Sequence, residues 1–100
     1  MIEVQPLQFE EGTALAVTVR LPKTTLLAVT TDKGYIMCGA LDVGLLNERL
    51  AQREIVAGRA VGVKTIQELL DAPLESVTIT AESIGIVAGM TGSEAIRKMF

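Results

Sequence analysis

The chain has 100 residues, 49% of them apolar but only 3% aromatic, and 9 basic and 12 acidic side chains give it a net charge of −3. This length predicts a single domain, residues 1–100, and so aliphatic a composition predicts a homo-oligomer. With no basic cluster, no stacking aromatics and no apolar run of about 18 residues, neither a nucleic-acid partner nor a membrane span is expected. The N-terminus lacks the basic and apolar regions of a signal peptide, and one cysteine permits no intrachain disulfide, so a cytoplasmic location is expected.

The chain contains no histidine. This excludes Ser-His-Asp and Cys-His catalysis built from this chain, and with them a zinc site of the usual Cys/His type. No acidic cluster of the D-x-D-x-D kind is present either, so neither a metal site nor a cofactor is expected.

The first forty residues have the pattern of strands. Residues 2–7 begin a strand that Pro6 restricts to an edge or an end, and Glu10 to Gly12 form a turn. Residues 13–21, TALAVTVRL, alternate between a face of Leu and Val and a face of Ala, Thr and Arg, which is typical of a half-buried strand.

Two more strands follow, residues 24–31 and 35–40, and complete an antiparallel meander. Pro22 and Lys23 separate the first of them from the preceding strand. Asp32, Lys33 and Gly34 form a three-residue loop whose glycine is expected in the left-handed region.

From residue 42 the apolar period changes to that of a helix, with Val43, Leu46 and Leu50 on one face. Asp42 is placed to cap or charge the start of this helix. The remaining segments are, in order, a strand in 55–62, a helix capped by Thr65 with Glu68 and ended by Pro73, a strand over 76–80, and a helix capped by Thr91 with Glu94.

The resulting order is β-β-β-β-α-β-α-β-α. It predicts an α+β fold, a two-layer α/β sandwich in which an antiparallel meander is followed by helix-connected strands. Three short helices are expected to cover one sheet face and leave the other free for a partner chain.

Three segments, LPKTTLLAV, GYIMCGALDVGLLNERL and IVAGRAVGVKTIQELLDAPLESVT, span residues 21–78 and resemble the YunC-like family of small bacterial and archaeal proteins. The later segment GIVAGMTGSEAIRKM is also in keeping with that family. The resemblance implies a compact two-layer α/β fold and an unknown function. It supplies no catalytic residues.

Cys38 is the first candidate for chemistry, because it lies where a strand ends before a helix. A helix start favours a thiolate, and Gly39 would let a substrate approach the backbone. Asp42 could accept a proton, although a carboxylate would also oppose ionisation of the thiol. The alternative is that Cys38 is a small buried hydrophobe.

A glycine-containing loop before a capped helix is the second candidate, for a small anionic ligand. Its residues are Gly58, Arg59, Gly62, Lys64 and Thr65. Free N–H groups and two cationic side chains would attract a carboxylate or phosphate. The spacing differs from a nucleotide phosphate loop, and the alternative is a tight turn with a solvated lysine.

Two functions therefore remain open. The first is a small oligomeric binding or regulatory module for an anionic ligand. The second is a small-molecule enzyme with Cys38 and Asp42 at its site.

Overall fold

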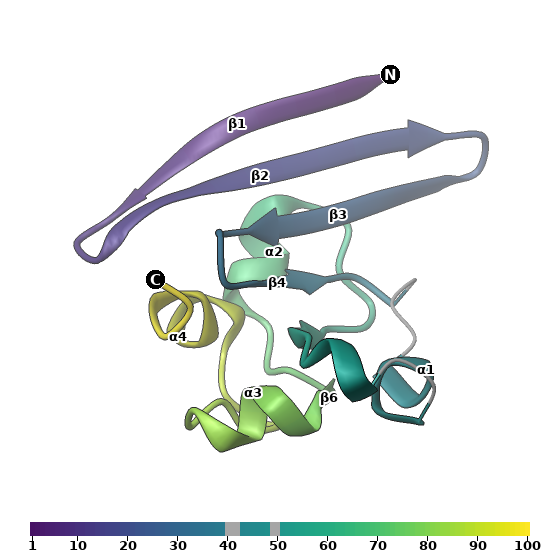
Figure 1. Ribbon diagram of the computed structural model, residues 1–100. Helices are drawn as coiled ribbons and strands as arrows, with labels where there is room; N and C mark the ends of the chain where they lie inside the picture. The colour runs from purple at the N-terminus through teal and green to yellow at the C-terminus, as the bar shows by residue number, and fades with distance from the viewer. Residues whose placement is uncertain (40–42, 49–50) are drawn as a thin grey trace.

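The computed structural model describes residues 1–39, 43–48 and 51–100 and shows one mixed sheet with short helices packed against it (Figure 1). The strands are β1 Ile2–Phe9, β2 Gly12–Leu21, β3 Thr24–Thr30, β4 Gly34–Met37, β5 Val56–Arg59 and β6 Ser76–Val77. The helices are α1 Val43–Glu48, the 3-10 helix η1 Ala51–Arg53, α2 Ile66–Asp71, α3 Ile79–Ser83 and α4 Gly92–Arg97. Two residues of the predicted first helix, Asp42 and Leu50, lie outside the described residues.

The six strands follow chain order across the sheet, β1-β2-β3-β4-β5-β6. Neighbours are antiparallel except β4 and β5, which run parallel with α1 in the connection between them. The predicted α+β class and the meander followed by helix-connected strands are confirmed. Among the described residues, no helix is long and apolar enough to cross a membrane.

One face of the sheet, here called the inner face, carries the core. Leu27, Val29 and Ile36 on this face are fully buried with Leu69 of α2 and Ile96 of α4. The opposite side chains of the meander form the outer face, which consists of the even positions of β1 and β3 and the odd positions of β2 and β4.

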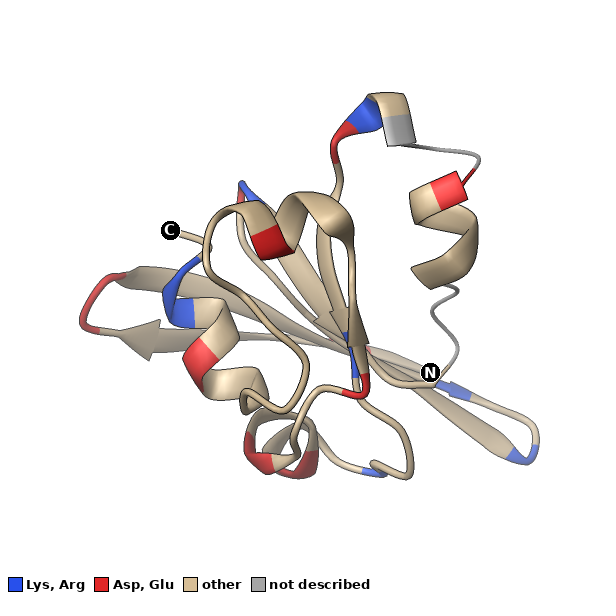
Figure 2. Ribbon diagram, turned by 90° about the horizontal axis from the view of Figure 1, so that it is seen from below, with Lys and Arg blue, Asp and Glu red and all other residues tan. Residues whose placement is uncertain are grey.

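Helix α1 packs apart from α2 and α4, on the other side of β4 and β5 (Figure 2). It is joined to the start of α3, where Ile79 N–H donates to Asn47 Oδ1 at 2.9 Å. Its Val43 and Leu46 are buried outside the main core cluster, as is Ala57 of β5. The register pairs Ala57 with Tyr35 and so places it on the outer side of the sheet. Helix α1 therefore borders the outer face without covering the meander.

The prediction of a strand over residues 76–80 is wrong beyond Val77. The strand ends there, and Ile79–Ser83 form helix α3. The cause is Thr78, whose hydroxyl accepts a hydrogen bond from Ala81 N–H at 3.2 Å and thereby caps the helix. The β-branched residues through Thr80 favour a strand, and this preference outweighed the capping signal of Thr78 in the prediction.

The predicted hairpin between β3 and β4 is present, but Gly34 does not adopt the predicted left-handed conformation. It is the first residue of β4 and is buried. A Cβ at this position would lie 2.5 Å from the carbonyl oxygen of Val56. Close approach of the parallel neighbour β5, rather than turn geometry, requires glycine here.

The two predicted threonine caps, Thr65 and Thr91, are confirmed. Thr65 accepts from Glu68 N–H at 3.1 Å, and Thr91 with Glu94 forms a complete capping box. At the first cap the Glu68 carboxylate reaches back to Lys64 N–H at 2.6 Å. Each of these two helices therefore begins with its own side chains bound to its first N–H groups.

Candidate functional site

Cys38 follows β4 on the inner face and is 7% exposed within the core cluster. Its Sγ accepts a hydrogen bond from Leu27 N–H at 3.5 Å, and its own N–H donates to Leu27 O at 3.1 Å. This burial supports the interpretation of Cys38 as a small hydrophobe. Asp42, its predicted partner, lies outside the described residues, so the catalytic role of the pair stays a prediction.

We expect the Cys38 thiol to resist alkylation in the folded protein because reagent reaches it only when the core opens. Labelling by iodoacetamide at neutral pH should be on the order of 100-fold slower in buffer than in denaturing urea. The measurement is intact mass over several hours. Equal rates in the two conditions would show an accessible thiol and would restore the nucleophile interpretation.

The structure brings Gly39 and Arg59 together where the parallel strands β4 and β5 end. Arg59 donates from Nε and Nη2 to the Gly39 carbonyl at 3.3 and 3.2 Å. Its Nη1 also forms an ion pair with Glu75 Oε2 at 2.8 Å. A hydrogen bond from the Ser76 side chain, together with the Arg59 charge, lowers the pKa of Glu75 despite opposing desolvation. The guanidinium is thus already bound to a carboxylate and a carbonyl.

The other predicted ligand-binding residues have separate surroundings. Gly58 is buried, and a Cβ there would lie 2.8 Å from Leu74 Cδ1, so close packing accounts for the glycine. Gly62 is exposed with φ +74°, which makes it a turn glycine. Thr65 caps α2, and the backbone N–H of Lys64 is bound by Glu68. The helix start is therefore occupied by groups of the same chain.

Lys64 nevertheless lines a surface cavity of about 350 Å³. The other lining residues are Lys23, Thr24, Thr25 and Val63. The cavity is thus bordered by the β5–α2 loop and by the tip of the hairpin between β2 and β3. Within the described part of the chain, neither lysine ammonium has a hydrogen-bond or ion-pair partner.

Lys23 has a backbone conformation that glycine or asparagine would adopt more readily. It follows Pro22 in the two-residue turn and has φ +63°. A left-handed non-glycine residue costs about 1–2 kcal/mol, and such residues concentrate at ligand sites. Lys23, Thr24 and Thr25 were not predicted as site residues, because the sequence pattern marks this turn only as a break between strands.

A larger cavity, about 580 Å³, lies between the β1–β2 turn and the C-terminal residues. Its one lysine and a neighbouring threonine are engaged within the chain: Lys33 Nζ donates to Phe100 O at 2.8 Å, and Thr31 Oγ1 donates to Met99 O at 2.8 Å. This cavity therefore offers fewer available cations than the smaller one. Residues 1–39, 43–48 and 51–100 contain no group of three or more Cys, Asp or Glu side chains that could hold a metal ion.

Comparison with known proteins gives three matches. The family model of a domain of unknown function, DUF1805, matches residues 37–99. The chain is 63% identical to the uncharacterized protein YunC of Bacillus subtilis (strain 168) over 99 residues, covering 99% of this chain and 98% of that protein. The crystal structure of TA1206, a protein of unknown function from Thermoplasma acidophilum, matches with a TM-score of 0.89 at 26% identity, covering 100% of this chain and 94% of that one. The relatives thus support the fold and the family resemblance and assign no activity.

Proposed function

Since the chain belongs to the DUF1805 family, whose function is unknown, we propose from its geometry that it is a binding module for a small anionic ligand. The ligand would bind in the cavity between Lys23 and Lys64. The observation that carries the proposal is that two lysines from separate loops line one cavity, neither matched by a carboxylate among the described residues.

The chemistry of this cavity suits a ligand with more than one negative oxygen. Each ammonium group offers three donors, and the hydroxyls of Thr24 and Thr25 add donors beside them. Val63 supplies an apolar contact from the loop that carries Lys64. Cations from two loops would hold a phosphate or a dicarboxylate by charge-assisted hydrogen bonds.

Arg59 has no direct part in this proposal. Its bonds to Gly39 and Glu75 tie the end of β4 to the segment before β6. We place it as a positioning residue for the β5–α2 loop, which supplies Val63 and Lys64. We therefore propose that the anion binds in the cavity beside the start of α2, and not at the N–H groups of the helix start itself.

The expected result is that inorganic pyrophosphate or citrate at low ionic strength raises the melting temperature. A ligand at 100 times its Kd stabilises the folded state by about 2.7 kcal/mol. The double variant K23A/K64A should lose the shift, because both donor groups are removed. Differential scanning fluorimetry across a panel of anions is the measurement.

Lys98→Ala is the matched control, since it removes one exposed lysine outside the cavity. It should respond to the anions as the parent does. An equal shift in the double variant, or no shift with any anion in the parent, would overturn the proposed function.

A further inference from the structure

The outer face of the meander carries no charged side chain. All its positions lie within the described residues, and none is Asp, Glu, Lys or Arg. Its aliphatic block is built around Val17 and Val19 of β2, which pair with Val4 and Ile2 on one side and with Ala28 and Leu26 on the other. An antiparallel sheet with one solvated face normally carries polar side chains there. The polar side chains of the outer face, Gln8, Thr13, Thr24, Thr30 and Tyr35, lie at or near strand ends, and the aliphatic block between them has the composition of a buried face.

The exposed fractions of individual side chains show the same pattern, in which small side chains are buried and larger ones are exposed. On β2, Ala14 and Ala16 point into the core with 0% and 2% exposure, whereas Leu15 on the outer face is 45% exposed. On the edge strand β1, Ile2 and Val4 are 69% and 59% exposed. Apart from Leu7, which packs against the core from the inner face, the larger aliphatic side chains of these two strands face away from the core of their own chain.

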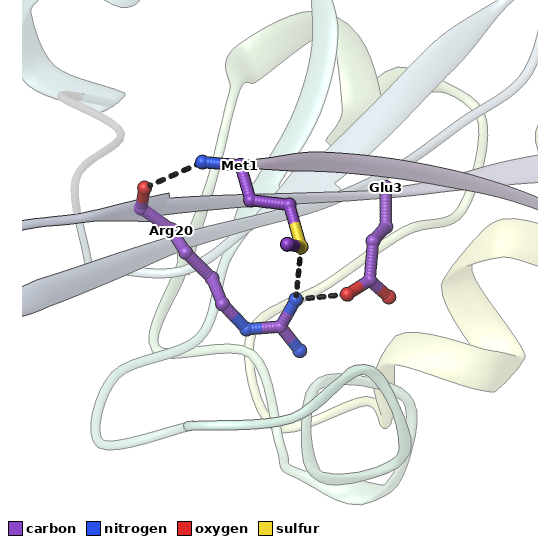
Figure 3. A network of polar contacts seen from close by, with 3 residues as sticks. All are labelled: Met1, Glu3 and Arg20. Atoms are coloured by element: carbon purple, nitrogen blue, oxygen red, sulfur yellow. Dashed lines mark hydrogen bonds and ion pairs between the residues drawn. The ribbon is translucent and has the colours of Figure 1, made fainter.

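The inner face provides an internal comparison, because the end of β1 and β2 extends past the helices. There Glu3 and Arg20 form an ion pair, and Arg20 O accepts from the Met1 amino group at 3.3 Å (Figure 3). The side chains of Glu3 and Arg20 lie on the same side of the two strands (Figure 3). Where the inner face meets water it is charged, whereas the outer face of the same two strands is not. The position of β1 and β2 at the exposed edge of the sheet therefore does not explain why their outer face lacks charged side chains.

We propose that the outer face of β1–β4 packs against the outer face of a second copy of this chain, related by a two-fold axis. Strands of 8 and 10 residues in β1 and β2 set the length of the contact. With four strands about 4.8 Å apart, the planar footprint is on the order of 500 Å². Because side chains project from the plane of the sheet, the solvent-accessible area of this face is larger than its footprint. It approaches the roughly 800 Å² that each partner buries in a standard interface.

A second copy fits this face better than other occupants. An uncharged face placed on itself leaves no charge buried without a partner, and a two-fold contact is self-complementary by construction. A surface that binds anionic lipid would need basic residues around it, but the chain has a net charge of −3. The two sheets would stack about 10 Å apart, as in a β-sandwich.

The inference goes beyond the proposed function. The cavity between Lys23 and Lys64 shares only Thr24 with the outer face, and the two proposals are tested by different measurements. A monomeric protein whose melting temperature still rises with pyrophosphate would overturn the dimer alone. A dimer that ignores every anion would overturn the binding function alone.

The test is the solution mass by size exclusion with light scattering at about 100 µM. The full chain should have twice its 10.6 kDa mass. Val4→Lys and Val17→Lys, which put a charge into the aliphatic block of the outer face, should give the mass of one chain with unchanged far-ultraviolet circular dichroism. Gln5→Lys is the matched control: it adds the same charge one residue along the edge strand, on the inner side, and should remain dimeric.

Any parent mass other than twice that of the chain overturns the proposal. So does a Val4→Lys variant that folds and keeps the parent's mass. Val4 is exposed on an edge strand, so its replacement tests the contact with little disturbance of the core.

Discussion

Thr78→Val is expected to lower the free energy of unfolding by about 3–5 kcal/mol. Thr78 is 2% exposed and is the one buried polar side chain among the described residues. Its hydroxyl donates to Ile55 O at 2.6 Å and accepts from Ala57 N–H and Ala81 N–H, each at 3.2 Å. One oxygen atom thus joins β5, the segment before it and the first turn of α3.

Valine keeps the shape of threonine and removes all three bonds. A buried donor or acceptor left without a partner costs about 1–3 kcal/mol, so the several losses together exceed the small gain from the added methyl group. Urea denaturation followed by circular dichroism measures the change as a lower midpoint.

Thr78→Ser is the matched control, because it retains Oγ and loses only a methyl group. We expect it to cost about 1 kcal/mol. A valine variant no less stable than the serine variant would show that the hydroxyl is not the link between β5 and α3.

Gly92→Ala is expected to destabilise the protein by about 2–3 kcal/mol, which lowers the melting temperature by roughly 10–15 °C. Gly92 is the first residue of α4 and is buried against α2. A Cβ there would lie 2.3 Å from the carbonyl oxygen of Leu69 and 2.8 Å from Ile36 Cδ1. The N–H of Gly92 also donates to Ala72 O at 3.1 Å, so the two helices cannot separate without losing this bond.

Helix propensity favours alanine over glycine, so it partly offsets the destabilisation expected for Gly92→Ala. Alanine is better than glycine inside a helix by about 1 kcal/mol, and by less in the first turn. The clash is with a backbone atom, which cannot rotate away, so the cost of overpacking exceeds this gain in helix propensity.

The control is Gly39→Ala, whose added Cβ would make ordinary contacts at 3.7 Å with Arg59 and Val61. It should shift the melting temperature by only a few degrees. If the Gly92→Ala and Gly39→Ala variants have the same melting temperature, the close approach of α4 to α2 does not limit the stability of the protein.

Much of the meander and both helix caps could be predicted from local sequence. Period-2 alternation in 13–21 and the turns around Pro22 and Asp32 predict antiparallel neighbours, because these signals depend only on adjacent residues. The caps at Thr65 and Thr91 were found for the same reason. Helix α3 was missed, since the β-branched run through Thr80 outweighed a cap whose other bonds go to Ile55 and Ala57, more than twenty residues away.

The sequence singles out one lysine of the proposed site, Lys64, and its role there stays a prediction. It gives no sign of Lys23, because the two loops lie far apart in the sequence and meet only when β2–β3 folds beside the β5–α2 loop. Arg59 was expected to bind a ligand, and the structure shows it paired with Glu75. Spacing along a chain cannot show which carboxylate folds back onto a given arginine.

Local sequence was sufficient for the α+β class, the order of the meander and the exclusion of histidine chemistry, since each depends on composition or on short-range periodicity. Which face of β2 is buried depends on tertiary packing. Alternation separates Ala16 from Leu15, but both faces are apolar enough to form a core, and the short helices pack on the side where small residues let them approach. The larger side chains are thereby left on the outer face, where a second copy of the chain is proposed to cover them.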